Sequence, residues 1–238
     1  MTTKKMSAAM NTPNLGLRSA EIGSPGARPR TLSHALAIWV AAITVLAMTV
    51  LAAPVQAASK KAAAEPITQV YFIRGFMGVF STGFDKMAKD LEKSRIHAEV
   101  YSHLSASAIT AKIVREFGQS KKRRKKLVLI GHSFGGNAAL SVASQLRQKD
   151  IRVDLVITVD PTRSGPVSPN VRKYVNYYFP GNGLGAKLAA KSVPAKRITN
   201  IDMRKRSDIA GEGDDHWTIT NNAAITKEIT TAIKRALR

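Results

Sequence analysis

Hydrophobic residues beyond position 66 fall into short apolar runs that alternate with longer amphipathic stretches. Six runs have the length and residue types of buried strands: Ile67–Ile73, Ala98–Tyr101, Leu127–Ile130, Val153–Val159, Tyr174–Phe179 and Arg197–Met203. Apolar residues at helical spacing predict helices at Gly83–Lys93, at Ala106–Phe117, directly after Ser133, and after a cap at Asn221 or Asn222. Strands that alternate with helices predict an α/β fold, a mostly parallel sheet with helices on both faces.

The stretch LVLIGHSFGGNAAL, residues 127–140, combines a strand, a sharp turn at Ser133 and a helix. The turn contains G-x-S-x-G, with Gly131 and Gly135 two residues before and after the serine. Side chains at these two positions would collide in such a turn, so glycine suits both of them. The pattern predicts a nucleophile elbow, which presents the Ser133 hydroxyl over the edge of the sheet at the start of a helix.

A serine hydroxyl is a poor nucleophile at neutral pH and needs a neighbouring base, which is usually histidine. The chain has five histidines. His34 lies near the N-terminus, His97 and His103 flank a strand before the turn, and the side chain of His132 should point away from that of Ser133. His216, in the loop before the last helix, is therefore the candidate base.

The base needs a carboxylate that fixes its tautomer. Asp160 follows the strand next after Ser133, and the carboxyl ends of parallel strands share one edge of the sheet. Pro161 behind it is expected to restrict Asp160 to extended conformations. Asp202, at the end of the last strand, is the alternative acid, although Arg204 and Arg206 offer it ion-pair partners.

An acyl-transfer site also needs two donors for the developing oxyanion. The N–H of Phe134, directly after the serine, is one candidate. The second should come from the loop after the first strand, where Gly75 permits a turn and the Phe76 N–H is our choice.

These features together resemble the α/β-hydrolase fold superfamily, and its lipase-, esterase- and thioesterase-like members in particular. The resemblance covers about residues 67–238 and rests on GHSFGG, on VDP after the following strand and on DHW before the last helix. The order Ser133, Asp160, His216 matches that of the superfamily. The resemblance implies hydrolysis of an ester or thioester without a cofactor. Where members usually carry His-Gly in the oxyanion loop, this chain has Arg74-Gly75, and an arginine there would favour anionic substrates.

The net charge and the absence of cysteine limit the kinds of partner and bound group that this chain is expected to have. The chain of 238 residues has a net charge of +21, which favours contact with anionic surfaces such as a membrane. It has no cysteine, and its histidines show no metal-ligand spacing, so neither disulfides nor a metal site is expected. No nucleic-acid-binding module accompanies the charge. The basic run Lys121–Lys126 is interpreted as a solvated loop at the edge remote from Ser133, with an anion or membrane contact as the alternative.

The N-terminal 57 residues resemble an export signal. Residues 1–33 are basic, contain prolines and glycines and should be disordered, and residues 35–53 carry no charge and should form one apolar helix. Val55-Gln56-Ala57 predicts cleavage after Ala57, which leaves a linker at 58–66. The apolar run approaches the ~20 residues that span a bilayer, so an uncleaved anchor is the alternative. Both interpretations export the domain, to the periplasm or beyond.

Two functions follow from these patterns. The first is an exported serine esterase acting on a small-molecule or lipid ester. Its site would be open, because the few residues between Pro161 and the next strand leave no room for a helical lid. The second is a catalytically degenerate hydrolase fold that binds anionic components of the cell envelope.

Overall fold

The computed structural model describes residues 68–118, 125–181 and 183–238. The expectations for residues 1–67, including the apolar helix at 35–53, cleavage after Ala57 and the linker, lie outside the described residues, as does most of the run Lys121–Lys126. Within the described part of the chain, no helix combines the length and hydrophobicity that crossing a bilayer requires.

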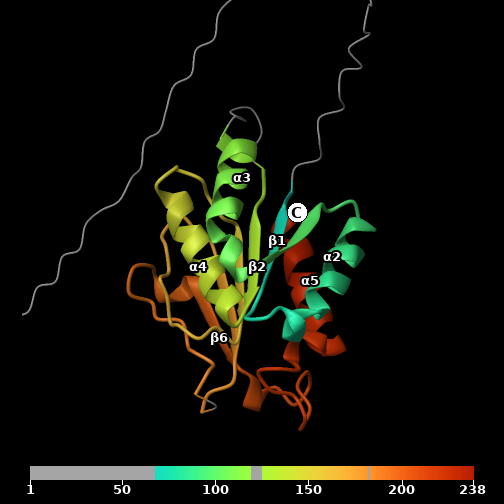
Figure 1. Ribbon diagram of the computed structural model, residues 1–238. Helices are drawn as coiled ribbons and strands as arrows, with labels where there is room; N and C mark the ends of the chain where they lie inside the picture. Colours follow the sequence, from blue (N-terminus) through green and yellow to red (C-terminus); the bar gives the residue numbers. More distant parts are fainter. Residues whose placement is uncertain (1–67, 119–124, 182) are drawn as a thin grey trace, which may run out of the picture. The chain divides into compact units, whose positions relative to one another are not determined.

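A six-stranded sheet forms the centre of the described domain (Figure 1). All neighbouring strands are parallel, in the order β2-β1-β3-β4-β5-β6. The strands are β1 (Val70–Arg74), β2 (Ala98–Ser102), β3 (Val128–His132), β4 (Leu155–Val159), β5 (Tyr174–Tyr178) and β6 (Ile198–Asp202). The predicted fold class is confirmed, with strand ends within about three residues of those expected.

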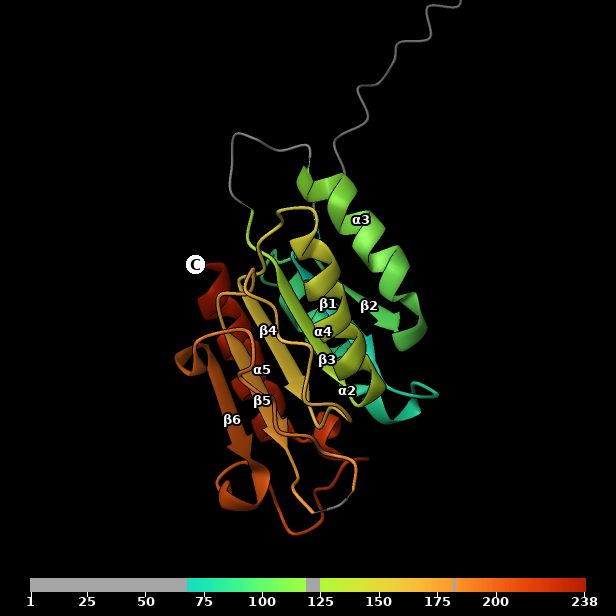
Figure 2. The same cartoon turned by 90° about the vertical axis from the view of Figure 1, so that its left-hand side faces the viewer.

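Helices cover both faces of this sheet, as the two hydrophobic clusters show. The helices are α2 (Gly83–Glu92), α3 (Ala106–Gly118), α4 (Phe134–Arg147) and α5 (Ala223–Leu237). α2 and α5 pack on one face, through residues such as Phe84 and Ile229. α3 and α4 pack on the other, through Ile109 and Val142, and α4 lies in front of the sheet in Figure 2. Each helix buries the apolar stripe from which it was predicted.

Two long loops replace helices beside β4, β5 and β6. None of the residues between β4 and β5 is helical, which agrees with the expected absence of a helical lid there. Between β5 and β6, the described residues contain a single 3-10 turn at Ala195–Arg197. Val167, Leu188 and Val193 from these loops are buried in the α3/α4 cluster. The loops therefore contribute to the core and also border the edge where the strands end.

The parallel register brings the candidate residues to one edge. His132, the last residue of β3, pairs with Val159 of β4, and Val159 pairs with Tyr177 of β5. Ser133 and Asp160 are therefore the first residues beyond two adjacent strands. Asn222 caps α5, its side chain accepting the N–H groups of Ala224 and Ile225, and so fixes the helix that follows the His216 loop.

Candidate active site

Ser133 lies in a backbone conformation that few residues other than glycine adopt. Its φ is 55° and its ψ is −124°, and its N–H donates to the carbonyl of Val159 at 2.9 Å. A Cβ on Gly131 would lie 2.0 Å from the carbonyl oxygen of Gly135, and one on Gly135 would lie 2.0 Å from that of Ile73. Glycine is thus required on both sides of the serine, as the elbow pattern predicts.

Three buried side chains form a continuous hydrogen-bonded row. His216 Nε2 lies 3.0 Å from Ser133 Oγ, and His216 Nδ1 lies 2.7 Å from Asp160 Oδ2. Because a carboxylate only accepts, Nδ1 carries the proton and Nε2 is left to accept from the serine hydroxyl. The structure brings together the three residues that the sequence singled out, from the ends of β3 and β4 and the loop before α5.

Asp160 is held in place by its backbone as well as by His216. Its N–H donates to the carbonyl of Tyr177 at 2.7 Å, and its Oδ1 accepts the N–H of Phe179 at 2.8 Å. Its φ is 47°, so the expectation that Pro161 would hold it extended is wrong. The proline disfavours the right-handed helical region, and Asp160 avoids that region by adopting the left-handed one instead. This turn aims one carboxylate oxygen at β5 and the other at His216.

The alternative acid, Asp202, is occupied elsewhere. It ends β6, two strands beyond β4 in the sheet, and its carboxylate oxygens accept from Arg204 Nε at 3.2 Å and Nη2 at 3.0 Å. The hydrogen bond from Arg204 lowers the pKa of the Asp202 carboxyl. Arg206, the other expected partner, pairs instead with Asp208 and Glu228. The structure therefore places Asp160 at the histidine and Asp202 in a local ion pair.

The two candidate oxyanion donors belong to the loop after β1 and to the residue directly after Ser133. The loop after β1 approaches the serine so closely that a Cβ on Gly75 would lie 3.0 Å from Ser133 Cβ. Phe76 follows directly, and the N–H of Phe134 belongs to the first turn of α4. Among the described residues, no hydrogen bond engages the backbone N–H of either phenylalanine. Both groups are accordingly available to a substrate.

Arg74 does not present a free charge to the site. Its guanidinium forms an ion pair with Asp85 of α2, and the side chains of both residues are about one-third exposed. The carboxylate offsets the positive charge that would have favoured an anionic substrate.

His132 has contacts that the sequence did not reveal. The ring is buried, with Nδ1 at 2.8 Å from Ser81 Oγ and Nε2 at 2.8 Å from the carbonyl oxygen of His216. Burial and the neighbouring His216 lower the pKa of His132 to about 4, so its ring is neutral at physiological pH. The elbow pattern placed this side chain away from Ser133 but gave no sign of Ser81, which is 51 residues distant.

Large apolar side chains are exposed in the segments that follow β1, β2 and β3 and beside His216. The described residues contain seven exposed large apolar side chains, which we call the apolar rim: Phe76, Met77, Val79, Phe80, Leu104, Phe134 and Trp217. They come from the loops after β1, β2 and β3 and from the residue after His216. The rings of Phe76 and Phe134 lie 6.3 Å apart, and Trp217 contacts both Phe80 and His216. Apolar surface gathered in this way marks a ligand or interaction site, and no single segment of the sequence shows it.

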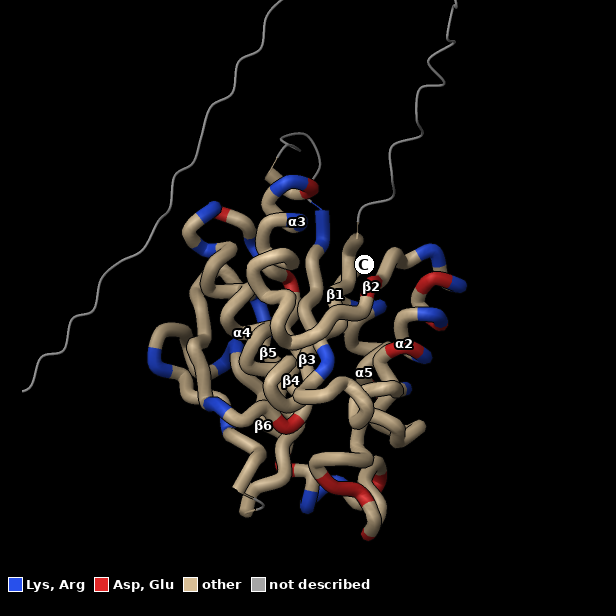
Figure 3. Tube along the Cα trace, viewed as in Figure 1, with Lys and Arg blue, Asp and Glu red and all other residues tan. Residues whose placement is uncertain are grey.

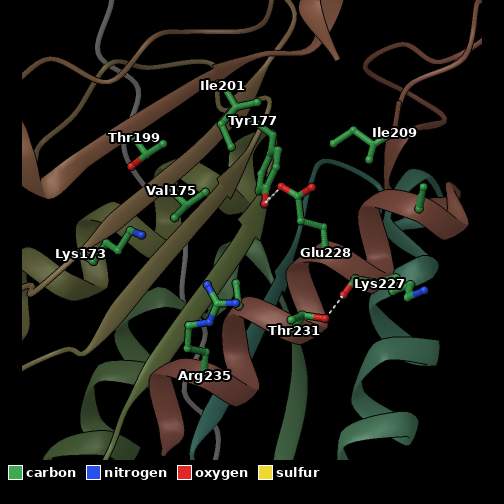
Figure 4. Close-up of a pocket in the computed structure, with 12 residues that line it drawn as sticks. Lys173, Val175, Tyr177, Thr199, Ile201, Ile209, Lys227, Glu228, Thr231 and Arg235 are labelled. Atoms are coloured by element: carbon green, nitrogen blue, oxygen red, sulfur yellow. Dashed lines mark hydrogen bonds between the residues drawn. The ribbon is translucent and has the colours of Figure 1, made fainter. Parts of the chain in front are cut away.

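A groove opens on the α5 face, lined by residues of β5, β6 and α5 (Figure 4). It has a volume of about 530 Å³ and separates β5 and β6 from α5. Tyr177, Glu228 and Arg235 are among the residues that line it, and Ser133, Asp160 and His216 are not. Elsewhere, the described residues hold no cluster of three or more histidine and acidic side chains suited to a metal ion.

Comparison with known proteins gives structural matches alone. No family model matches the chain, and no curated protein matches its sequence. Among solved structures, the NocB thioesterase domain, in a covalent complex with a fluorophosphonate nocardicin G analog, is 15% identical with a TM-score of 0.45, over 72% of this chain and 95% of that one. A putative α/β-superfamily hydrolase from Xanthomonas campestris pv. campestris is 15% identical with a TM-score of 0.41, over 71% of this chain and 98% of that one. A putative hydrolase from Pectobacterium atrosepticum is 13% identical with a TM-score of 0.40, over 72% and 93%.

The chain's own geometry carries the assignment of its fold. The sheet is parallel, a strand enters a strained serine turn that opens a helix, and the serine, the acid and the histidine follow in that order. We conclude that the described domain of this protein has the α/β-hydrolase fold.

Proposed function

We propose that this protein is a serine hydrolase that cleaves carboxylic esters, with Ser133 as nucleophile, His216 as general base and Asp160 as the acid that orients it. The observation that carries the proposal is the row of hydrogen bonds from Ser133 Oγ through the His216 ring to Asp160. In this arrangement a base lies within hydrogen-bonding reach of the nucleophile and is itself oriented by a third group.

The chemistry follows from this row in two halves. Ser133 Oγ attacks the ester carbonyl carbon while His216 Nε2 takes the hydroxyl proton, and the N–H groups of Phe76 and Phe134 stabilise the oxyanion. When the tetrahedral intermediate collapses, the alcohol leaves with that proton and an acyl-serine remains. Water then attacks the acyl carbon with His216 as base, and the carboxylic acid departs as Ser133 recovers its proton.

The apolar rim favours esters that carry apolar groups as substrates. Phe76 and Phe134, whose N–H groups would hold the oxyanion, also contribute their rings to the rim, so an ester bound at Ser133 would contact them. Leu104, in the turn after β2, is 82% exposed. Extra methylene groups on the substrate would be partly removed from water at the rim, and full burial of one CH₂ contributes ~0.8 kcal/mol.

Export remains part of the proposal, carried by the sequence pattern of residues 1–57. Contact with an anionic membrane is proposed from the net charge. Acidic residues of the His216 loop, Asp214 and Asp215 among them, lie next to Trp217, and Figure 3 shows acidic positions gathered in this part of the chain. Such a contact would therefore use basic surface away from the rim.

The proposal is tested with a fluorophosphonate probe and a series of p-nitrophenyl esters from acetate to palmitate. The probe should label the wild-type protein at Ser133, and kcat/KM should rise with acyl length by up to ~4-fold per CH₂. Ser133→Ala should abolish labelling and lower kcat by up to ~10⁶. Ser94→Ala, which changes an exposed serine that bonds Lys234, is the matched control and should leave both readouts unchanged. Wild-type protein that folds but neither reacts nor hydrolyses would support the degenerate binding module instead.

A further inference from the structure

We propose that His132 is a positioning residue, which links the loop carrying one oxyanion donor to the loop carrying the base through the buried hydroxyl of Ser81. The inference rests on the proposed function, because it assigns His132 a part in holding that site together. The hydrogen bonds behind it include neither the Ser133 hydroxyl nor the Asp160 carboxylate.

The first link joins Ser81 to the loop after β1. Ser81 ends the 3-10 turn Val79–Ser81 and is fully buried, and its Oγ accepts the N–H of Gly75 at 3.1 Å. His103 bonds the carbonyl group of the same glycine, with its Nδ1 at 3.2 Å from the Gly75 oxygen. Gly75 is thus bonded at both its N–H and its C=O, directly before the candidate donor Phe76.

The second link joins His132 to the loop of the base. His132 Nε2 lies 2.8 Å from the carbonyl oxygen of His216. A carbonyl only accepts, so Nε2 must carry the proton, and in a neutral ring Nδ1 is then an acceptor. Nδ1 lies 2.8 Å from Ser81 Oγ, whose hydroxyl can donate to it.

Only one arrangement of protons satisfies the whole chain. The Gly75 N–H donates to Ser81 Oγ, the Ser81 hydroxyl donates to His132 Nδ1, and His132 Nε2–H donates to the His216 carbonyl. A protonated ring would turn Nδ1 into a donor and leave the serine hydroxyl without this acceptor. Burial, reinforced by the electrostatic effect of the His216 ring, lowers the pKa of His132 and keeps the ring neutral, while the hydrogen bond to the His216 carbonyl and the Asp160 carboxylate act in the opposite direction. The network therefore stays in one hydrogen-bonding state at neutral pH.

The consequence is that two parts of the site share one anchor. A Cβ on Gly75 would lie 3.3 Å from His132 Nδ1 and 3.0 Å from Ser133 Cβ, so the loop, the anchor and the nucleophile are in contact. The His132 and His216 rings lie 4.9 Å apart. A shift of His132 would move the Phe76 N–H and the base relative to Ser133, and catalysis is sensitive to such small displacements.

Two substitutions of His132 test its bond to Ser81 and its bond to the His216 carbonyl separately. The amide of Asn occupies the region of Nδ1, so His132→Asn can keep the bond to Ser81 but loses the one to His216. The longer Gln reaches the region of Nε2, so His132→Gln can keep the bond to His216 but loses the one to Ser81. His97→Asn is the matched control, because His97 is a partly exposed residue whose partners, Glu92 and Glu99, lie outside the site.

Each variant is assayed for kcat, KM, melting temperature and the Ki of a trifluoromethyl ketone, which forms an oxyanion at the nucleophile. We expect kcat to fall ~10–100-fold in both variants, less than the ~10²–10³ for outright loss of an oxyanion donor, while KM stays within about twofold. The ketone Ki should rise most in His132→Gln, and the pH profile of kcat should shift most in His132→Asn. His97→Asn should match the wild type in all four measurements.

The outcomes are distinct. If the wild type hydrolyses esters and both variants keep its kcat while only their melting temperature falls, His132 is merely structural and the inference is overturned. An inert wild type that does not react with the fluorophosphonate overturns the proposed function and this inference with it. Should neither variant fold, the imidazole nitrogen shifts of wild-type His132 decide. A neutral Nε2–H ring from pH 5 to pH 8 supports the network, and an Nδ1–H ring or a protonated ring at pH 6 overturns it.

Discussion

Replacement of Asp160 by asparagine gives the sharpest test of the row that ends at Ser133. In the wild type, Oδ1 accepts the Phe179 N–H at 2.8 Å and Oδ2 faces His216 Nδ1 at 2.7 Å. An amide has one acceptor and one donor end, and the Phe179 N–H selects the oxygen for its own side. The NH₂ group is then directed at His216, where the wild type has an acceptor.

The expected effect is large because the change inverts the histidine rather than merely weakening a bond. A donor facing Nδ1 favours the tautomer with the proton on Nε2, and such a ring cannot accept the proton of Ser133. The same inversion in a well-studied Ser-His-Asp triad lowers kcat by ~10⁴. We expect Asp160→Asn to lower kcat toward that extent in steady-state assays with a p-nitrophenyl ester, with little change in KM and with the fold intact by circular dichroism.

Asp202→Asn is the matched control. That residue ends a strand in the same way but bonds Arg204, and its side chain is only partly buried. It should keep kcat within about twofold, since a surface ion pair contributes ~0–1 kcal/mol. Equal losses in the two variants, or a loss only in Asp202→Asn, would refute the assignment of Asp160 as the acid. Retention of kcat by a well-folded Asp160→Asn would show that His216 needs no carboxylate partner.

Three further predictions follow from the same coordinates and sequence. Gly185→Ala should lower kcat more than ~10-fold, within the range for misplaced catalytic groups, because its methyl group would lie 1.9 Å from Asp160 Oδ1. Gly211→Ala is the control and should leave kcat unchanged, because its methyl group would lie no closer than 3.8 Å to another atom. Equal kcat values in the two variants would contradict the argument from crowding at Asp160. The folded-state pKa of His132, about 4, lies below the 6.5 of the unfolded chain, so its contribution is present above pH 6.5 and is lost as pH falls. Urea titrations should show a loss of about 2 kcal/mol between pH 7 and pH 5 that His132→Asn lacks; parallel curves would mean that His132 titrates normally. N-terminal sequencing of the protein from its producing cell should begin at Ala58, and a soluble cytoplasmic product that begins at Met1 would exclude both the signal and the anchor.

The apolar rim and the α5 groove show why position relative to the nucleophile matters more than the size of a cavity. The groove is roomy, but its lining comes from β5, β6 and α5 and includes none of the three residues of the row. The rim is exposed surface, yet Phe134 and Trp217 follow Ser133 and His216 directly in the chain. An ester at Ser133 would contact the rim, and this is why the rim informs the choice of substrate.

Much of the fold was determined by the sequence alone, because the relevant forces act over a few residues. Apolar periodicity marked the strands and helices, since one face of each had to be buried. The elbow was visible because its two glycines are required within two residues of Ser133. The pairing of Ser133 with Asp160 could also be predicted, since parallel strands bring their carboxyl ends to one edge of the sheet. At the last helix, local sequence narrowed the cap to two asparagines, and Asn222 provides it.

Tertiary structure decided the contacts between residues far apart in the chain. Asp160 and Asp202 both end strands, and only the sheet order places one of them at His216 and leaves the other with Arg204. Pro161 suggested an extended Asp160, but bonds to β5 and its loop hold it in the left-handed region. The links of His132 to Ser81 and to the His216 loop span 51 and 84 residues. Such contacts depend on how loops from separate strands converge, and hydrophobic periodicity carries no information about that.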